Sequence, residues 1–538
     1  MPVTEPVISP RQYRLWSFVV AVLVGLGIFF RVANLGEPVY WVDEVATSMR
    51  VSGYTQAEVT AQVATGEALT VEDLQKFQTI RRDRPPNDLL RVLSKSPEHA
   101  PLYFMLARFW AERFGTSVVA MRSLSVICSI LTLPAMYGLG RSLFSDRTSR
   151  AGALVGQTAM ALLAISPFFV AYAQEARPYS LWVCLLLLSG QWLWRALQTN
   201  RLRHWVCYGL LLIPTLYTSI LSILVVLGQG LAVLVFQTKR WWNYAISTGL
   251  ALLTMLPWVW IILSQWETLQ SNTRWMYLPL PVWEIFGAWL YGLAVVFFDV
   301  PVAIDRPVVL VLQIIIAAVT LSLLGYAVYY LVRHAPRSVW SYVLAGALAV
   351  PTVLFLGDLV RNGQASASPR YMMPTFLGIL MALAYWFSHG LLAKRKRQNL
   401  IVIGLLLSIG LVSCVFGLTE TSPYQKSRSL SNAAITALIN QAAAPQVITI
   451  PHYIQDSMSL SYDLNSDVSL YILPSPDFSE ETLARIVDPK RPTFFLTPSE
   501  RMKTTVESQQ LGILHSVYQA NKLKSGEFGL NLWFLESD

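Results

Sequence analysis

The stretch SPFFVAYAQEARPYS, residues 166–180, decides the fold class of this chain. It places a polar turn, residues 174–179, between two apolar runs that are each long enough to cross a bilayer. Charged side chains between two membrane spans are costly unless they act on something at the membrane surface. Together with the acidic pair Asp43-Glu44 beyond the first apolar run, this turn predicts an integral-membrane enzyme.

The composition supports a multispan membrane protein. The 538 residues are 54% hydrophobic and only 14% charged, and the mean hydropathy is +0.46. The net charge of +9 comes from basic residues in short links between apolar runs, which indicates membrane topology rather than nucleic-acid binding. A disulfide framework or a thiolate metal site is not expected, because the cysteines lie in apolar runs without a CxxC pair. The four cysteines are Cys128, Cys184, Cys207 and Cys414.

Eleven apolar runs approach the length of about 20 residues that a membrane span requires. They are residues 15–32, 118–139, 151–170, 179–194, 205–220, 221–236, 242–263, 308–331, 339–356, 371–391 and 400–418. The first run follows Arg11 and Arg14 as a signal sequence would, but no convincing cleavage site comes after it. We therefore expect an uncleaved first span.

Basic residues fall in alternate loops, which the positive-inside rule assigns to the cytoplasm. These loops contain Arg11, Arg14, Arg141, Arg147, Arg150, Arg195, Arg201, Arg203, Lys239, Arg240, Arg333, Arg337 and residues 394–397. The opposite loops contain Asp43-Glu44, the turn 174–178, residues 265–281, residues 358–369 and the C-terminal tail. With an odd number of spans in the plasma (inner) membrane, the N-terminus is predicted inside and the tail outside.

Two shorter apolar runs, residues 101–110 and 282–298, would invert this pattern if they crossed the membrane. We therefore expect them to be interfacial or re-entrant helices on the outer face. The prediction is an all-α polytopic domain over residues 1–418, with a large first outer loop at 33–117. A small extracytoplasmic α/β domain is predicted for residues 419–538.

The outer loop is predicted to contain amphipathic helices. Thr55-x-x-Glu58 is a capping-box pattern. Ser96-Pro97-Glu98 is predicted to open the helix that carries His99 and Tyr103, and residues 81–86 form a polar break. The tail alternates helical and strand-like segments, which favours a partly parallel sheet. We expect helices at 429–443, 480–487 and 499–509, and strands at 447–450, 468–473, 493–496 and 530–535.

Asp43-Glu44 is the first candidate for chemistry. One carboxylate could act as a general base while the other orients it or a metal. The alternative is a solvated loop acid, or an N-cap for a helix that starts near Val45. Tyr40 and Trp41 suit either a membrane-interface belt or a sugar-stacking wall.

The second candidate is the turn that contains Glu175, Arg177 and Tyr179. A guanidinium fork matches phosphate oxygens, so Arg177 could bind phosphate, although an arginine at a span end can also snorkel to the surface. Arg370, in the sequence SPRYMMP at 368–374, and Arg361 also lie in an outer loop, against the charge bias. The three arginines could hold one anionic headgroup, or Arg361 and Arg370 could contact lipid phosphates without selectivity.

His99, in the sequence EHAPLY at 98–103, could be a base, a hydrogen-bond donor or a ligand, but a lone His at a helix start is more often an ordinary polar residue. His99 and two acids could form a metal site, although no HxxxH or HExxH spacing supports one. Arg122 lies early in the second span, where an arginine is expensive and usually has a partner or a ligand.

These motifs, in this order, resemble the GT-C class of integral-membrane glycosyltransferases. The closest likeness is to the bacterial branch of the protein O-mannosyltransferase superfamily, glycosyltransferase family 39, which includes lipid A aminoarabinose transferases and galacturonosyl transferases. The likeness extends over about residues 31–197 of this chain. The motifs are VDEV at 42–45, HAPLY at 99–103, FGTS at 114–117, AMRSL at 120–124, SP at 166–167 and QEARPY at 174–179. SPRY at 368–371 extends it weakly.

The resemblance implies an inverting hexosyl or pentosyl transferase that uses a polyprenyl-phosphate sugar on the extracytoplasmic face. Asp43 would take the proton from the acceptor hydroxyl, and Glu44 could share that role or help to hold a divalent metal. The basic residues that would neutralise the leaving phosphate are Arg177, Arg370, Arg122 and Arg361. The residues expected to contact substrate are Glu175, Tyr179, His99, Tyr103 and Tyr371.

The resemblance implies no certain cofactor; a divalent metal bound by Asp43, Glu44 and His99 is possible. The expected partners are the lipid-linked sugar, membrane lipids, and a lipid, glycan or protein acceptor, with no nucleic acid. The chain departs from the family pattern in having only Ala100-Pro101 where paired prolines are frequent, and in its long polar loop. Both departures leave the acceptor open. The alternatives are a transferase that uses a polyprenyl diphosphate donor and a transporter or flippase for a lipid-linked sugar.

Overall fold

The computed structural model describes residues 9–145, 149–236, 238–303, 306–392, 396–419, 424–474, 478–520 and 529–536. Arg147 and residues 394–395, which the topology prediction used, lie outside these ranges. The chain forms two compact units. The helical unit comprises residues 1–33, 96–103 and 122–419, and the mixed unit comprises residues 34–95, 104–121 and 420–538. The outer loop is therefore mostly part of the same compact unit as the tail.

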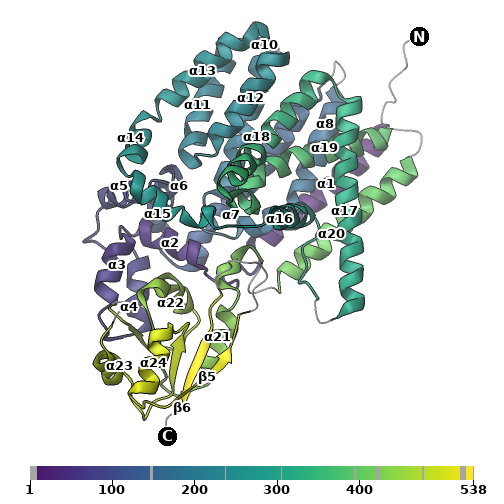
Figure 1. Cartoon of the computed structure of the whole chain (residues 1–538). Coiled ribbons are helices and arrows are strands. Elements are labelled where there is room, and N and C mark those ends of the chain that lie inside the picture. Colours follow the sequence, from purple (N-terminus) through teal and green to yellow (C-terminus); the bar gives the residue numbers. More distant parts are fainter. Residues whose placement is uncertain are drawn as a thin grey trace, which may run out of the picture. The chain divides into compact units, whose positions relative to one another are not determined.

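All eleven predicted apolar runs are helical in the structure (Figure 1). The helices are α1 (Pro10–Val32), α7 (Val118–Leu143), α8 (Ser149–Ala164), α9 (Pro167–Ala173), α10 (Tyr179–Thr199), α11 (Leu202–Thr218), α12 (Ser222–Phe236), α13 (Trp241–Leu253), α14 (Leu256–Ser264), α17 (Pro307–His334), α18 (Arg337–Arg361), α19 (Met373–Leu392) and α20 (Lys396–Gly417). Shorter elements of the same unit are η2 (Thr238–Arg240), α15 (Trp266–Asn272), η3 (Arg274–Tyr277), α16 (Val282–Ala294), η4 (Ala365–Ala367) and η5 (Pro369–Met372).

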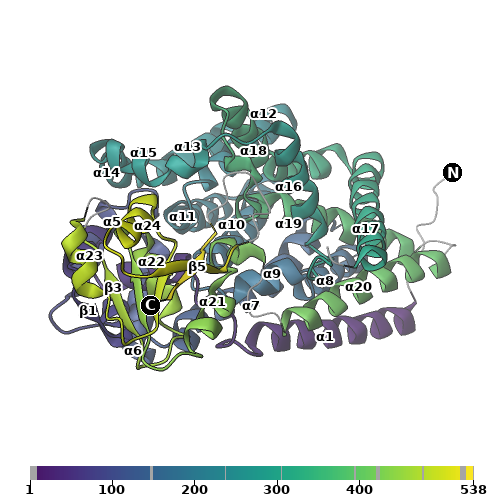
Figure 2. The ribbon, with the colours of Figure 1, turned by 60° about the horizontal axis from the view of Figure 1, so that its bottom comes forward.

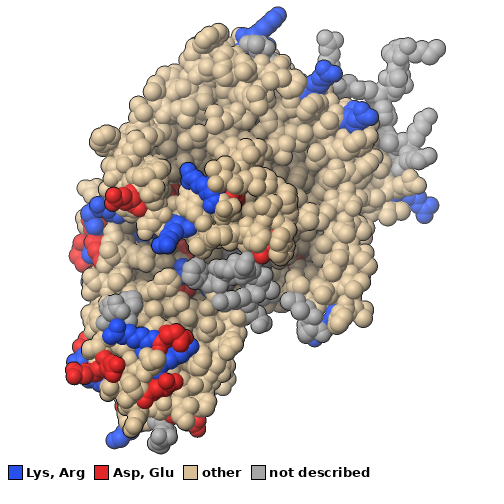
Figure 3. Space-filling model, viewed as in Figure 1, with Lys and Arg blue, Asp and Glu red and all other residues tan. Residues whose placement is uncertain are grey.

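Seven spans among the described residues are long and apolar enough to cross a membrane, or up to nine if each bent helix pair counts as one span. The predicted number of eleven is higher, because α11 and α12 have only 17 and 15 residues. The bent pairs are α8 with α9, at 63°, and α13 with α14, at 52°. On the face seen in Figure 3, most of the surface of the helical unit is uncharged, as expected for helices that face lipid.

Arg31 joins two of these spans in the helical unit, a role that the sequence analysis did not assign to it. Its side chain is fully buried and donates to the carbonyl oxygens of Leu163 and Ala164 at 3.0 and 2.6 Å, and to Ser129 Oγ at 2.9 Å. A Cβ at Gly27 would clash with the Ala164 carbonyl, so the glycine permits α1 and α8 to approach closely. These hydrogen bonds satisfy the carbonyls exposed where α8 ends and the chain bends into α9.

The two short apolar runs form α6 (Leu102–Phe114) and α16, each of 13 residues. A helix of that length covers only about 20 Å, which is too short to cross the hydrocarbon core. The predicted start of the first helix was wrong. Ser96-Pro97-Glu98 forms a turn in which the His99 N–H donates to the Ser96 carbonyl at 3.0 Å, and α6 begins at Leu102.

The mixed unit contains a six-stranded sheet in the order β1-β3-β2-β4-β6-β5. Its strands are β1 (Ala68–Leu69), β2 (Gln446–Thr449), β3 (Ser469–Ile472), β4 (Thr493–Leu496), β5 (Ile513–Tyr518) and β6 (Leu532–Glu536). β2 pairs in parallel with β3 and β4, and the other pairings are antiparallel, so the predicted partly parallel sheet is confirmed. The outer loop contributes β1, and the sequence analysis missed both β1 and β5.

Several helices of the mixed unit, including α23 and α24, flank this sheet (Figures 1 and 2). Besides α6, the helices of this unit are α2 (Val42–Val51), α3 (Gln56–Val63), α4 (Val71–Gln75), η1 (Lys76–Gln78), α5 (Pro86–Ser94), η6 (Tyr424–Ser429), α21 (Asn432–Ile439), η7 (Pro451–Tyr453), α22 (Ile454–Leu460), α23 (Glu480–Ile486) and α24 (Glu500–Ser508). Leu483 and Met502, from α23 and α24, pack into one core with Ile448 and Phe495 of the sheet. The capping box of Thr55 and Glu58 is confirmed at the start of α3.

Candidate active site

Asp43 and Glu44 lie in the first turn of α2 within the mixed unit. The alternative in which they are solvated loop acids, or cap a helix that starts near Val45, does not hold, because both residues lie inside α2, which begins at Val42. Glu44 is fully buried, whereas Asp43 is partly exposed. The partial positive charge at a helix N-terminus favours ionised carboxylates in the first turn. Of the two acids, Asp43 is the one whose surface is partly open to solvent.

Glu44 forms a buried ion pair with Lys426. Lys426 Nζ lies 3.0 Å from Glu44 Oε2 and donates to the Val39 carbonyl at 2.8 Å. The side chains of Lys426 and Glu44 are 2% and 0% exposed. A buried carboxylate needs such a partner, because an isolated charge is expensive away from water. This pairing gives Glu44 a structural role at the start of α2.

A second ion pair from the tail lies close to Asp43. Arg428 donates through Nε to Asp456 Oδ1 at 3.0 Å and through Nη2 to Asp456 Oδ2 at 2.6 Å. Burial alone would lower the pKa of Arg428, but the charges and hydrogen bonds of Asp456 and the charge of Asp43 outweigh it and raise this pKa above its ordinary value. Lys426, Arg428 and Asp456 were not among the residues predicted from the sequence. The one available signal was two basic residues just after the last span, on the side where few basic residues are expected.

The tail also contacts the backbone that leads into α2. Ser459 Oγ donates to the Tyr40 carbonyl at 2.6 Å, and the Val42 N–H donates to Ser429 Oγ at 3.4 Å. The rings of Tyr40 and Tyr462 meet edge to face, with centroids 4.8 Å apart. Residues from η6 and α22 therefore hold the N-terminal end of α2 in position.

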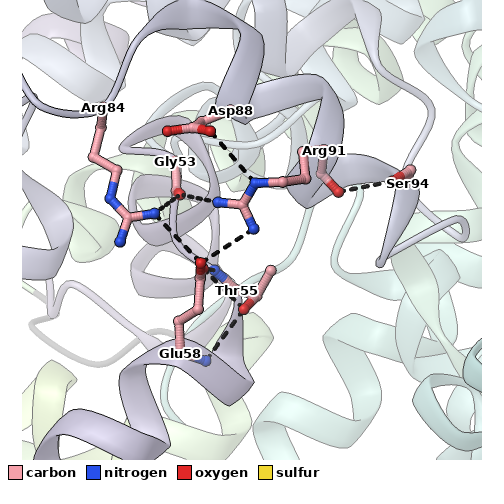
Figure 4. A network of polar contacts seen from close by, with 7 residues as sticks. All are labelled: Gly53, Thr55, Glu58, Arg84, Asp88, Arg91 and Ser94. Atoms are coloured by element: carbon pink, nitrogen blue, oxygen red, sulfur yellow. Dashed lines mark hydrogen bonds and ion pairs between the residues drawn. The ribbon is translucent and has the colours of Figure 1, made fainter.

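Arginines hold the other end of α2 (Figure 4). Arg84 and Arg91 both donate to the Gly53 carbonyl, at 3.3 and 3.4 Å, and both pair with Glu58, at 3.4 and 3.1 Å. Gly53 has a φ of +87°, a left-handed conformation that glycine adopts without strain. Arg108 donates to the Val51 carbonyl at 2.9 Å. Cations at a helix C-terminus satisfy its last carbonyls and the helix dipole.

In the helical unit, the turn between α9 and α10 carries Glu175 and Arg177. Both are buried, Arg177 to 6% exposure, so the alternative in which Arg177 snorkels to the surface was wrong. The Arg177 guanidinium lies 5.7 Å from the Tyr179 ring centroid. Tyr103 and Ser125 share a 2.9 Å hydrogen bond, and Ser125 Oγ donates to the Arg177 carbonyl at 3.1 Å. Tyr103 therefore supports the turn through Ser125.

The same turn is tied to the end of the first span. Gln174 Nε2 donates to the carbonyl oxygens of Phe30 and Ala33 at 2.9 and 2.8 Å. These are among the carbonyls that the last turn of α1 leaves without helical partners. Gln174 thus anchors the turn to α1.

Two further predicted residues lie in the helical unit. Arg122 is fully buried near the start of α7. His99 lies beside Glu98, with Nε2 3.6 Å from Glu98 Oε1, and Glu98 accepts hydrogen bonds from Asn272 at 3.1 and 3.2 Å. Asp43 and Glu44 belong to the mixed unit, whereas His99 and all four predicted arginines belong to the helical unit.

The structure brings Arg361, Arg370 and Tyr371 together around η3. Arg361 Nη1 donates to the Tyr277 hydroxyl at 3.1 Å. The Arg370 guanidinium lies 5.6 Å from the ring centroids of both Trp275 and Tyr371. A guanidinium that stacks on aromatic rings is held in one orientation and keeps its charge. Trp275 and Tyr277 were not predicted as site residues, because the sequence around them shows no pattern apart from their aromatic character.

A buried turn holds this arginine cluster in place. Asp358 is 4% exposed and accepts from the backbone N–H groups of Ala365 and Ser366 at 2.8 and 2.7 Å. Gln364 donates through its backbone and its side chain to the carbonyl oxygens of Met276 and Trp275. Arg361 and Arg370 are therefore presented from a constrained loop.

An apolar cavity of about 510 Å³ adjoins this loop. Helices α16, α17, α18 and α19 and the segments η4 and η5 form its walls. The lining includes Trp289, Gly292, Phe355, Pro369, Met372 and Phe376. Pro369 and Met372 flank Arg370 and Tyr371 in the sequence, so the cationic segment also forms part of an apolar wall.

Among the described residues, no group of three or more His, Cys, Asp and Glu side chains is arranged to hold a metal ion. Asp43 and Glu44 also belong to a different unit from His99. The possible metal site of these three residues therefore gains no support from the arrangement within either unit.

Comparisons with known proteins agree with this architecture. Residues 98–262 match the family model described as dolichyl-phosphate-mannose-protein mannosyltransferase, and no curated protein matches the chain. ArnT from Cupriavidus metallidurans in the apo state has a similar structure, with 12% identity and a TM-score of 0.50 over 97% of this chain and 98% of that chain. The structure of the same protein bound to undecaprenyl phosphate has 13% sequence identity and a TM-score of 0.47, over 96% of this chain and 98% of that chain.

The apo oligosaccharyltransferase of Archaeoglobus fulgidus gives 11% identity and a TM-score of 0.46, over 90% of this chain and 70% of that chain. At such low sequence identities, a structural similarity shows the fold alone. The comparison with apo ArnT supports the predicted GT-C fold, with its helical membrane part and small sheet. The family match over residues 98–262 and the similarity of the fold to apo ArnT both agree with the predicted resemblance to multi-pass GT-C glycosyltransferases of the protein mannosyltransferase superfamily.

Proposed function

We propose that this protein transfers a sugar from a polyprenyl-phosphate donor to an acceptor hydroxyl on the extracytoplasmic face of the plasma membrane. The observation that carries the proposal is the apolar cavity whose wall includes Pro369 and Met372, on either side of Arg370. An apolar cavity next to a fixed cation suits a ligand with a hydrocarbon tail and an anionic head. The name of the matched family, which refers to dolichyl-phosphate mannose, agrees with that donor class.

On this proposal, the prenyl tail occupies the cavity and the donor phosphate binds arginines of the helical unit. Arg370 and Arg361 are oriented by aromatic rings, and Arg177 and Arg122 are buried. As the bond between the sugar C1 and the phosphate oxygen breaks, negative charge grows on the phosphate. Fixed cations stabilise that developing charge most strongly in the transition state.

Asp43 is the proposed general base. Its place in the first turn of α2 favours the ionised form, and its partial exposure leaves it accessible to an acceptor. Asp43 takes the proton as the acceptor oxygen attacks C1, and the polyprenyl phosphate departs with the electrons of the C1–O bond. A base opposite the leaving group implies inversion at C1, by the geometry that applies to inverting glycosidases.

A transfer assay tests the proposal. Purified protein in lipid is given radiolabelled polyprenyl-phosphate sugars and a membrane extract as acceptor, and is compared with Asp43→Asn and with Glu72→Gln. Glu72 is an exposed acid on another helix of the same unit. We expect label to move to the acceptor with wild type and Glu72→Gln but not with Asp43→Asn, while all three bind donor.

Two results would contradict the proposal. Transfer by Asp43→Asn at the wild-type rate would refute the assignment of the base. Movement of label across the bilayer without transfer to any acceptor would identify a transporter of lipid-linked sugars.

A further inference from the structure

Trp275 is a partly exposed aromatic residue of η3 to which the proposed reaction assigns no role. The Arg370 guanidinium lies 5.6 Å from the centroid of its ring and 5.6 Å from that of Tyr371. The two rings lie 6.4 Å apart, with an interplanar angle of 33°. All three residues belong to the helical unit. Trp275 is therefore a direct neighbour of a cation that is proposed to bind the donor phosphate.

The neighbouring loop fixes the backbone of η3. Gln364 donates through its backbone N–H to the Met276 carbonyl at 2.8 Å, and through Nε2 to the Trp275 carbonyl at 3.0 Å. A Cβ at Gly363 would lie 2.6 Å from the Met276 carbonyl oxygen, so the glycine permits this close approach. A side chain held on a fixed backbone can keep the geometry that ligand binding requires. Trp275 is presented in that way.

Trp275 lies beside Arg370 but outside the apolar cavity. Pro369 and Met372, which flank Arg370 in the sequence, line the cavity, whereas Trp275 is not among the described lining residues. A polyprenyl-phosphate sugar carries its groups in the order tail, phosphate and sugar. With the tail in the cavity and the phosphate at Arg370, the sugar extends outside the cavity. Trp275 is an aromatic surface at that point.

An indole ring suits a sugar because one face of a pyranose consists of C–H groups. The electron-rich face of an aromatic ring attracts such weakly positive C–H groups, and the contact removes apolar surface from water. The indole N–H can also donate to a sugar hydroxyl. The other aromatic residue of η3 is already engaged, since the Tyr277 hydroxyl accepts from Arg361 at 3.1 Å. Trp275 is therefore the better candidate of the two for a sugar contact.

We propose that Trp275 binds the donor sugar, with its indole ring stacked on the C–H face of a pyranose, while the adjacent Arg370 binds the phosphate. The inference rests on the proposed function, in which a polyprenyl-phosphate sugar is the donor. It assigns recognition of the sugar to a residue other than the arginines. A pyranose with an unobstructed C–H face binds best, because an axial hydroxyl on that face would hold the ring away from the indole.

Equilibrium binding to the full chain in lipid nanodiscs tests this assignment. The ligands are undecaprenyl phosphate and undecaprenyl phosphate that carries glucose, mannose or aminoarabinose. The quantity compared is the affinity for the best-bound sugar-bearing lipid divided by the affinity for the bare lipid. Trp275→Leu removes the aromatic face, and Trp275→Phe keeps a smaller one. Trp283→Leu is the matched control, because Trp283 is 72% exposed on α16 and is not among the described residues that line the cavity.

We expect wild-type protein to bind the sugar-bearing lipid more tightly than the bare lipid. Trp275→Leu should lower the affinity for the sugar-bearing lipid by about tenfold and leave the affinity for the bare lipid nearly unchanged. Trp275→Phe should recover most of the wild-type ratio, and Trp283→Leu should keep it. Arg370→Gln should weaken binding of both lipids by a similar factor, because both carry the phosphate.

An equal loss for both lipids in Trp275→Leu would show that Trp275 serves only to orient Arg370, and would overturn the inference. An unchanged ratio in Trp275→Leu, or a wild-type ratio of one with every sugar, would overturn it as well. Failure of wild-type protein to bind undecaprenyl phosphate at all would instead refute the proposed donor site, and the inference would fall with it.

Discussion

Lys426 Nζ lies 3.0 Å from Glu44 Oε2, and 382 residues of sequence separate the two. Both side chains are almost completely buried, at 2% and 0% exposure. The tail thus contributes the counter-ion for an acid beside the proposed base. The stability of α2 should therefore depend on the tail.

Lys426→Met should destabilise the mixed unit strongly, because it leaves Glu44 charged and buried without its cation. Breaking one side of a buried pair typically costs about 3–5 kcal/mol. Thermal unfolding in detergent and proteolysis of residues 34–95 measure the effect. The double substitution Glu44→Met/Lys426→Met should recover much of the loss, and equal destabilisation in the single and double variants would contradict this account.

Arg81→Met is the control for that experiment. Arg81 pairs with Asp83 at 3.1 Å in the same unit, and their side chains are 49% and 63% exposed. An exposed pair of this kind contributes about 0–1 kcal/mol. Its loss should leave the unfolding temperature nearly unchanged.

Ser125→Ala should weaken binding of the polyprenyl-phosphate donor while leaving the protein folded. The hydroxyl links Tyr103 to the Arg177 carbonyl, at 2.9 and 3.1 Å, so its loss frees the turn that presents Arg177. We expect KM for the polyprenyl-phosphate sugar to rise by about tenfold, since a buried hydrogen bond contributes about 1 kcal/mol and its unpaired partner costs more. Ser142→Ala, at the other end of α7, should leave KM unchanged.

The effect of Gly292→Leu on donor binding should depend on the length of the prenyl chain. Gly292 lines the apolar cavity on α16, and a Cβ there would meet Phe376 at an ordinary contact distance of 3.6 Å. The larger side chain fills space without a forced backbone shift, so binding of long prenyl phosphates should weaken more than binding of short ones. Gly287→Leu, at an exposed position of the same helix, is the control. Equal loss for all chain lengths would argue against a prenyl site.

Acid should weaken the arginine cluster of Figure 4 through Glu58. Burial favours the neutral acid, but hydrogen bonds from Thr55 and the nearby Arg91 and Arg84 outweigh it and hold the pKa of Glu58 below its ordinary value. A depressed folded-state pKa contributes stability above the unfolded-state pKa, and this is lost as the pH falls through the folded-state pKa. The free energy of unfolding of the wild-type protein should therefore fall more steeply with decreasing pH below about pH 4.3.

Glu58→Gln should flatten that part of the stability profile, at a cost of about 1 kcal/mol near neutral pH. Glu67→Gln, at an exposed position outside the cluster, should keep the wild-type profile. An identical acid dependence in Glu58→Gln and wild type would assign the loss of stability to other carboxylates.

Local patterns in the sequence predicted much of the secondary structure. The apolar runs all form helices, the strand at 493–496 coincides with β4, and the capping box at Thr55 forms as expected. Hydrophobic length, strand composition and caps act over a few neighbouring residues, so they can be read without knowing the fold. The start of α6 was missed because a Ser-Pro-Glu pattern suits a turn as well as a helix cap.

By itself, the sequence determined the membrane character, the helical runs and the types of charged group available for chemistry. Tertiary structure alone decided that Lys426 neutralises Glu44, that Arg428 and Asp456 lie beside the helix of Asp43, and that β1 of the outer loop pairs with β3 of the tail. It also decided that aromatic rings orient Arg361 and Arg370 next to an apolar cavity. These relationships join residues far apart in the chain, and they depend on how complete elements pack, which no local pattern encodes.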